Sequence, residues 1–100
     1  MLYAFTAEDI AGSLSLRIKH RAEHRQRLEA LQAQGRLILA GPFPSLDAAD
    51  PGQAGFSGSL IVADFASQAD AQAWINADPY SRHGVFREVT VRPFQQVFPL

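Results

Sequence analysis

The sequence predicts an α+β fold in which four strands and two helices follow one another in the order β-α-β-β-α-β. Residues 13–34 contain neither proline nor glycine and are followed by Gly35, as expected of a helix with a glycine stop. An alanine-rich second helix follows Ser67 and ends before a proline. Short aromatic and aliphatic segments of strand length occupy the rest of the chain.

The first half of the chain supplies two strands and the long helix. The first strand is expected over residues 1–7, a turn over 8–12, and Ser13 is the expected N-cap of the helix. After Gly35, residues 36–43 form the second strand, which Gly41 and Pro42 close. Residues 44–56 are rich in proline and glycine and form a loop, which is either the lid or rim of a site or a tolerated insertion.

The second half repeats this pattern. The third strand is expected over residues 57–65, and Ser67 caps a helix over 68–77. The backbone before a proline avoids the α region, so the helix ends near Asp78 and residues 78–84 form a connection. The last strand covers 85–98. The order is that of a ferredoxin-like plait, a four-stranded antiparallel sheet with two helices on one face, and residues 1–100 are expected to form a single domain.

The first three strands are apolar on both sides, as the runs 37–39 and 60–62 show. A sheet with one face in water alternates polar and apolar residues instead. A second copy of the chain is the economical cover for the other face. The sequence therefore predicts a homodimer packed sheet to sheet, with residues 94–100 lying on the partner or exchanging with it.

Composition removes several classes of function. The absence of cysteine excludes disulfides, thiolate metal sites and a cysteine nucleophile. A net charge of −1 argues against general nucleic-acid binding. No basic leader and no apolar run near the roughly 20 residues of a membrane helix is present, so we expect a cytoplasmic protein without a membrane partner.

His24 is the best candidate for chemistry in the long helix. Leu28 and Leu31 follow it at i+4 and i+7, whereas Arg21 and Arg17 precede it at i−3 and i−7. His24 thus lies where an apolar stripe meets a basic one. The two arginines either help to bind an anionic small molecule or belong to a solvated helix face.

A set of short motifs follows one another along the chain: His24, Leu28, Leu31, residues 35–37, 41–42, 55–58, Trp74, 78–80 and 91–94. In this order and spacing, the set resembles the YciI-like family (the YCII-related domain). The resemblance covers nearly the whole chain and implies a dimeric ferredoxin-like α/β barrel. It also implies a small cytoplasmic enzyme with a histidine–aspartate pair in a pocket, here His24 and Asp78. The chemistry suspected for the family is lyase-like or isomerase-like, on small cyclic or aromatic compounds.

Physical reasoning supports this pair. Asp78 is expected at the C-terminal end of a helix, where the dipole disfavours a negative charge by roughly 0.3–1 kcal/mol, so it serves better as a partner than as a cap. An aspartate that accepts from one ring nitrogen orients the imidazole, and the other nitrogen acts as general acid or base, worth roughly 10²- to 10⁴-fold in rate. The alternatives are a structural His24 and an Asp78 that merely starts an Asp-Pro turn.

Tyr80, Ser59, Gly41 and Pro42 are further candidates for the pocket wall, although Tyr80 is as consistent with packing as with binding. His20 and His24 have a metal-ligand spacing on a helix, but no third ligand is evident. We therefore expect neither a metal nor a cofactor.

The predicted function is homodimeric acid–base catalysis on a small anionic or hydroxylated cyclic molecule. The alternative is a non-catalytic small-ligand-binding or regulatory module of the same fold. An RNA reader is disfavoured because the third strand is aliphatic and carries no surface aromatics.

Overall fold

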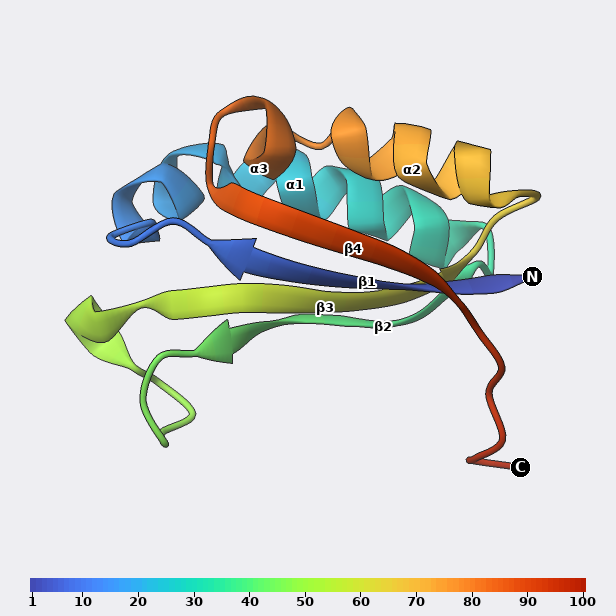
Figure 1. Cartoon of the computed structure of the whole chain (residues 1–100). Helices are drawn as coiled ribbons and strands as arrows, with labels where there is room; N and C mark the ends of the chain where they lie inside the picture. Colours follow the sequence, from blue (N-terminus) through green and yellow to red (C-terminus); the bar gives the residue numbers. More distant parts are fainter.

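A four-stranded antiparallel sheet forms the base of the fold. In the computed structural model, which describes residues 1–100, the strands lie in the spatial order β2-β3-β1-β4. The three α-helices cover one face of this sheet (Figure 1). The elements are β1 (Leu2–Asp9), α1 (Leu14–Ala33), β2 (Leu37–Pro44), the 3₁₀ helix η1 (Gly52–Ala54), β3 (Phe56–Asp64), α2 (Gln68–Asn76), α3 (Pro79–Arg82) and β4 (Phe86–Phe94). The predicted ferredoxin-like α+β fold is confirmed.

The core lies between the sheet and the helices. Alternation along β1 buries Tyr3, Phe5 and Ala7, which share one face of the strand. Phe5 is central, because its ring lies edge-on to those of Phe65 and Trp74 at centroid distances of 5.7 and 5.5 Å. This cluster packs β1 and α2 against each other, and Leu31 of α1 belongs to the same core.

The opposite face of the sheet has no helix over it. Ala4 of β1, Val62 of β3 and Leu39 of β2 are register neighbours there. Leu39 is 46% exposed and Phe94, at the end of β4, is 40% exposed. Residues after β4 leave the sheet on the side away from the helices (Figure 1). This face therefore presents apolar side chains to its surroundings.

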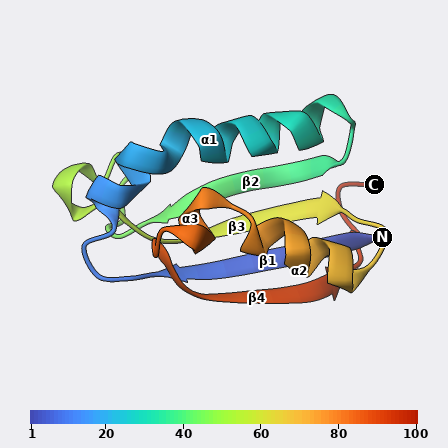
Figure 2. The ribbon, with the colours of Figure 1, turned by 90° about the horizontal axis from the view of Figure 1, so that it is seen from above.

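The long helix α1 carries polar residues on its buried side. Arg17, His24 and Leu31 are its buried residues, and they are seven positions apart, so they share one side of the helix. The chain leaves α1 through Gly35 at a φ of +71°, which confirms the expected glycine stop. α1 runs beside β2 and α2 lies over β1 and β4 (Figure 2). No helix is long and apolar enough to span a bilayer.

The two predicted helix caps differ in outcome. Ser67 caps α2 as expected, since its side chain accepts a hydrogen bond from the backbone N–H of Asp70 at 3.1 Å. Ser13 occupies the position before α1 but makes no capping bond. Its hydroxyl instead donates to Asp9 Oδ2 at 2.6 Å, because β1 continues to Asp9 through residues expected to form a turn.

The predictions for two segments were wrong. The connection 78–84 contains the one-turn helix α3, which begins at Pro79, a residue type favoured at the first helical position. The last strand ends at Phe94 rather than at residue 98. Phe94 pairs with Leu2, the first residue of β1, so the neighbouring strand offers no partner beyond this point.

Candidate active site

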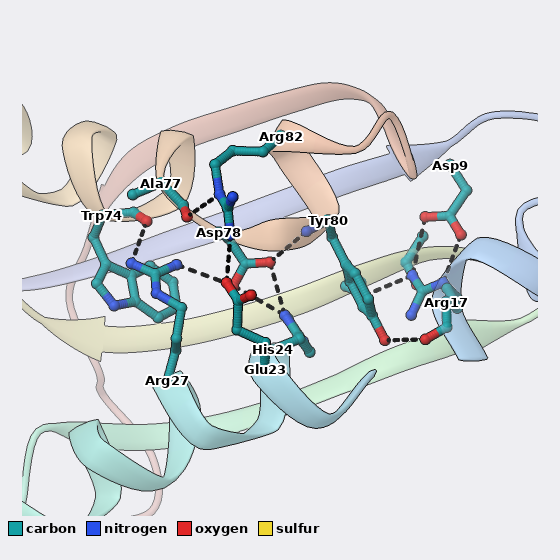
Figure 3. A network of polar contacts seen from close by, with 12 residues as sticks. Asp9, Arg17, Glu23, His24, Arg27, Trp74, Ala77, Asp78, Tyr80 and Arg82 are labelled. Atoms are coloured by element: carbon teal, nitrogen blue, oxygen red, sulfur yellow. Dashed lines mark hydrogen bonds and ion pairs between the residues drawn. The ribbon is translucent and has the colours of Figure 1, made fainter. Parts of the chain in front are cut away.

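The imidazole of His24 meets the carboxylate of Asp78 in the interior of the protein. Nδ1 of His24 lies 2.9 Å from Oδ1 and 3.0 Å from Oδ2 of Asp78. Asp78 is fully buried and His24 is 8% exposed. The two residues are far apart in sequence and meet because α1 packs against α3 (Figure 3). Such a contact fixes the orientation of the ring.

Asp78 occupies a helix start rather than a helix end, which corrects the prediction. It is the N-cap of α3, and its Oδ1 accepts a hydrogen bond from the backbone N–H of Tyr80 at 2.9 Å. α2 has already ended at Asn76. The free N–H groups of a first turn favour a carboxylate, so the local backbone stabilises the charge of Asp78 instead of opposing it.

A third side chain, Arg27, completes the surroundings of this carboxylate and was not predicted. Its Nη1 donates to Asp78 Oδ2 at 3.1 Å, and its Nη2 donates to the carbonyl oxygen of Trp74 at 2.8 Å. The guanidinium also lies over the Trp74 ring, 4.7 Å from the centroid. Its position three residues after His24, on the same side of the helix, was the signal that could have identified it.

Tyr80 covers one face of the His24 imidazole. Its ring is stacked on that of His24 with a centroid distance of 4.0 Å and an interplanar angle of 13°. Its hydroxyl donates to the carbonyl oxygen of Arg17 at 3.2 Å. Burial raises the pKa of Tyr80, although the charges of Arg17 and Arg21 oppose this shift. Tyr80 thus stays a neutral hydrogen-bond donor.

Arg17 is held in a fixed position by partners from two strands. Its Nε and Nη2 donate to the carboxylate of Asp9 at 2.6 and 2.9 Å, and Nη2 also reaches Ser59 Oγ at 2.9 Å and Gly58 O at 3.0 Å. Both members of this ion pair are buried. Asp9 was not predicted as a partner, because its approach to Arg17 depends on where β1 ends. Nη1 is the guanidinium nitrogen without a protein partner.

A cavity of about 470 Å³ lies between α1 and the β2–β3 edge of the sheet. Its wall is formed by Arg17, Arg21, His24, Arg25, Leu28, Glu29, Gln32, Leu37, Ala40, Gly41, Pro42, Phe56, Ser59, Ile61 and Tyr80. Every residue predicted for the site therefore lines this cavity except Asp78, which lies behind His24. Because Nδ1 of His24 faces Asp78, Nε2 is the ring nitrogen left for a ligand.

Two other expectations concern the surroundings of the cavity. Of the loop predicted over residues 44–56, only Phe56 lines this cavity, and the structure places it at the start of β3. His20, considered with His24 for its metal-ligand spacing, contacts His83. Its ring is stacked on that of His83 at 4.0 Å with an interplanar angle of 2°. No group of three or more histidine, aspartate or glutamate side chains has the arrangement of a metal site.

The sheet order and this cavity define a small ferredoxin-like α+β protein with a histidine in the cavity wall. The chain belongs to the YCII-related domain family, whose family model matches residues 1–95, so the resemblance seen in the motifs is confirmed. It is 50% identical over 98 residues to protein YciI of Escherichia coli O6:H1, covering 98% of this chain and 100% of that protein. It is 43% identical, with the same coverage, to an uncharacterized protein of Haemophilus influenzae.

A solved structure with the same fold comes from Burkholderia phenoliruptrix AC1100. It is 5-chloro-2-hydroxyhydroquinone dehydrochlorinase (TftG) in complex with 2,5-dihydroxybenzoquinone. The TM-score is 0.83 at 25% identity, with 95% of this chain and 94% of that chain covered.

Proposed function

We propose that this protein is an acid–base enzyme of the lyase or isomerase type that acts on small hydroxylated cyclic molecules. The observation that supports this most strongly is the imidazole of His24, held by a buried carboxylate in the wall of a cavity. The structural likeness to a dehydrochlorinase of a hydroxyhydroquinone supports the same class of chemistry.

His24 is the proton carrier in this proposal. Its Nδ1–H donates to Asp78, so Nε2 carries the lone pair and accepts a proton from a substrate hydroxyl. The carboxylate then stabilises the imidazolium that forms. Tyr80 restricts the ring from its other side, which reduces the cost of orienting it for each proton transfer.

The cavity fits a small ring with polar substituents. Its volume lies in the range of small-molecule sites, and Leu28 and Ile61 provide apolar walls. Ser59 and the free Nη1 of Arg17 supply hydrogen bonds for substrate oxygens, whereas Arg21 attracts an anionic group. Gly41 and Pro42 form part of the wall from the edge strand.

The reaction balances with protons and a leaving group alone. His24 takes the proton of a ring hydroxyl, the oxygen electron pair moves into the ring, and a ring carbon takes up a proton, which gives the keto tautomer. If that carbon carries chlorine, a second hydroxyl proton and chloride then depart together as HCl. The first step by itself is an isomerisation and the two together are an elimination, without net electron transfer to an acceptor.

The proposal includes a homodimer formed through the uncovered sheet face. Leu39 and Phe94 on that face, and Phe98 in the following segment, are all exposed in the single chain. Sedimentation of the wild type at the mass of two chains, and of Leu39→Lys at the mass of one, is the expected result. A wild-type monomer at micromolar concentration would contradict this part of the proposal. A cytoplasmic location remains a prediction.

The direct test uses 5-chloro-2-hydroxyhydroquinone and unchlorinated hydroxyhydroquinones as probes. Chloride release is followed for the chlorinated compound and the ultraviolet spectrum for the others. Wild type should turn over at least one of them, and His24→Gln should lose at least ~10²-fold in kcat. Gln72→Ala, on the exposed side of α2, is the control and should match wild type.

Two results would count against the enzyme. Equal rates for wild type and His24→Gln would remove the proton carrier. Stabilisation of the wild type by a probe in a thermal shift assay, without turnover of any probe, would favour the non-catalytic binding module.

A further inference from the structure

Arg27 is the charged side chain of the site that the proposed reaction does not use. It lies on α1 three residues after His24, on the opposite side of the Asp78 carboxylate from the imidazole (Figure 3). Its side chain is 21% exposed and does not line the cavity. A contact with substrate is therefore not its role, and its effect must pass through Asp78.

Each oxygen of the Asp78 carboxylate accepts hydrogen bonds from a different set of donors. Oδ1 accepts from His24 Nδ1 and from the backbone N–H of Tyr80. Oδ2 accepts from Arg27 Nη1 and lies 3.0 Å from His24 Nδ1. With donors at both oxygens, the buried group is suited to its ionised form, and Arg27 supplies the permanent positive charge that balances it.

We propose that Arg27 is a positioning residue that balances the charge of Asp78 and thereby keeps His24 ready to accept a proton. An aspartate without a countercharge stabilises imidazolium strongly and makes a histidine a poor base at neutral pH. With Arg27 in place, part of the carboxylate's charge is already compensated. This inference rests on the proposed function, because it assumes that His24 accepts a proton from a substrate. The effect of Arg27 on the titration midpoint of His24 can nevertheless be measured without turnover.

The geometry favours this role over a purely structural one. The Nη2 bond to Trp74 O and the stacking on the Trp74 ring fix the guanidinium at the junction between α2 and α3. Nη2 of Arg27 thus binds the backbone of α2 while Nη1 binds the carboxylate. The fold therefore fixes the distance between the guanidinium and Asp78. The other charged or titratable groups around His24 are Tyr80, Arg17, Arg21 and Arg25. Tyr80 binds Asp78 only through its backbone N–H, and none of the three arginines forms a hydrogen bond or ion pair with Asp78.

The test is an NMR titration of the His24 ring in wild type, Arg27→Gln and Arg27→Lys. In Arg27→Gln the titration midpoint should rise by about one pH unit, because the carboxylate loses its permanent countercharge. Arg27→Lys retains the charge and should stay nearer to wild type. Lys19→Gln removes one positive charge from an exposed position of the same helix and should leave the midpoint unchanged.

A double-mutant cycle separates coupling through Asp78 from a general loss of structure. In the Asp78→Asn background, Arg27→Gln should shift the His24 midpoint by less than ~0.3 pH units. An equal shift in both backgrounds, an unchanged or lowered midpoint in Arg27→Gln, or an equal rise in Lys19→Gln would overturn the inference. If Arg27→Gln does not fold, Arg27→Met replaces it, because its side chain is also uncharged and long enough to pack on Trp74. The His24 midpoint should rise in Arg27→Met as well, and an unchanged midpoint would overturn the inference.

The same variants distinguish this inference from the proposed function. If the enzyme is active, the acid limb of the pH–rate profile of Arg27→Gln should move upward with the NMR midpoint. If no probe is turned over but the NMR shifts appear as expected, the proposed reaction fails and the role of Arg27 as a countercharge stands.

Discussion

The phenol ring of Tyr80 lies nearly parallel to the imidazole of His24, with the ring centroids 4.0 Å apart. The same Tyr80 supplies the backbone N–H that Asp78 caps and the hydroxyl that reaches the backbone of α1. One residue of α3 thus contacts both members of the pair. Its hydroxyl and its ring make separate contributions, which two substitutions can distinguish.

Tyr80→Phe should lower the free energy of unfolding by about 1 kcal/mol, because it removes one buried hydrogen bond and keeps the ring. Tyr80→Leu should cost about 2–4 kcal/mol, since it also removes the stack and leaves a cavity. Urea denaturation followed by circular dichroism measures both. Equal losses for the two variants would show that the ring stack contributes little.

The buried ion pair of Asp9 and Arg17 should matter far more than its exposed neighbour. Asp9→Ala leaves the Arg17 charge buried without its partner and should cost about 3–5 kcal/mol. Glu8, the preceding residue of β1, pairs with Arg87 at the surface, and Glu8→Ala should cost less than about 1 kcal/mol. Denaturant unfolding of the two variants tests this contrast. Similar losses would contradict the argument from burial.

The stacked rings of His20 and His83 predict a pH effect. Partial desolvation and the neighbouring His83 lower the pKa of His20. The unfolded chain then binds this proton more readily than the folded one, so stability should fall as the pH drops below about 6.5. His83→Gln should raise the pKa of His20 in an NMR titration. An unchanged pKa of His20 in this variant would show that the pair is not coupled.

Gly58 of β3 should tolerate no side chain. A Cβ at this position would overlap the carbonyl oxygen of Ala7 on the paired strand. Gly58→Ala should therefore destabilise the fold by about 3 kcal/mol or more and displace Gly58 O from Arg17. Gly41→Ala meets no atom within 4 Å and should change stability by less than about 1 kcal/mol. Thermal unfolding compares the two, and equal transition temperatures would refute the clash.

The sequence was sufficient for most of the fold because its signals are local. Gly35 follows a helical pattern, and Ser67 stands directly before one. α3 was not predicted, because the four residues Pro79–Arg82 are equally compatible with a turn. The end of β4 was not predicted either, since it is set by the length of β1, a partner that the residues of β4 themselves do not reveal.

In the site, too, features within one helix could be predicted, whereas contacts between distant segments could not. His24 stood out from its place between the apolar and basic stripes of one helix. The contacts of Asp9 with Arg17, and of Arg27 with Asp78, join segments from different parts of the chain. They depend on strand register and on helix packing, which the pattern of residue types does not specify.

Oδ1 of Asp78 accepts both the imidazole of His24 and the N–H that starts α3. Asp78 would therefore be conserved whether its role is to orient His24 or to start α3. A relative without the proposed reaction would still need the aspartate as the N-cap of this short helix. Persistence of Asp78 among relatives would thus say little about their activity, and His24, which starts no helix, would be the more informative position.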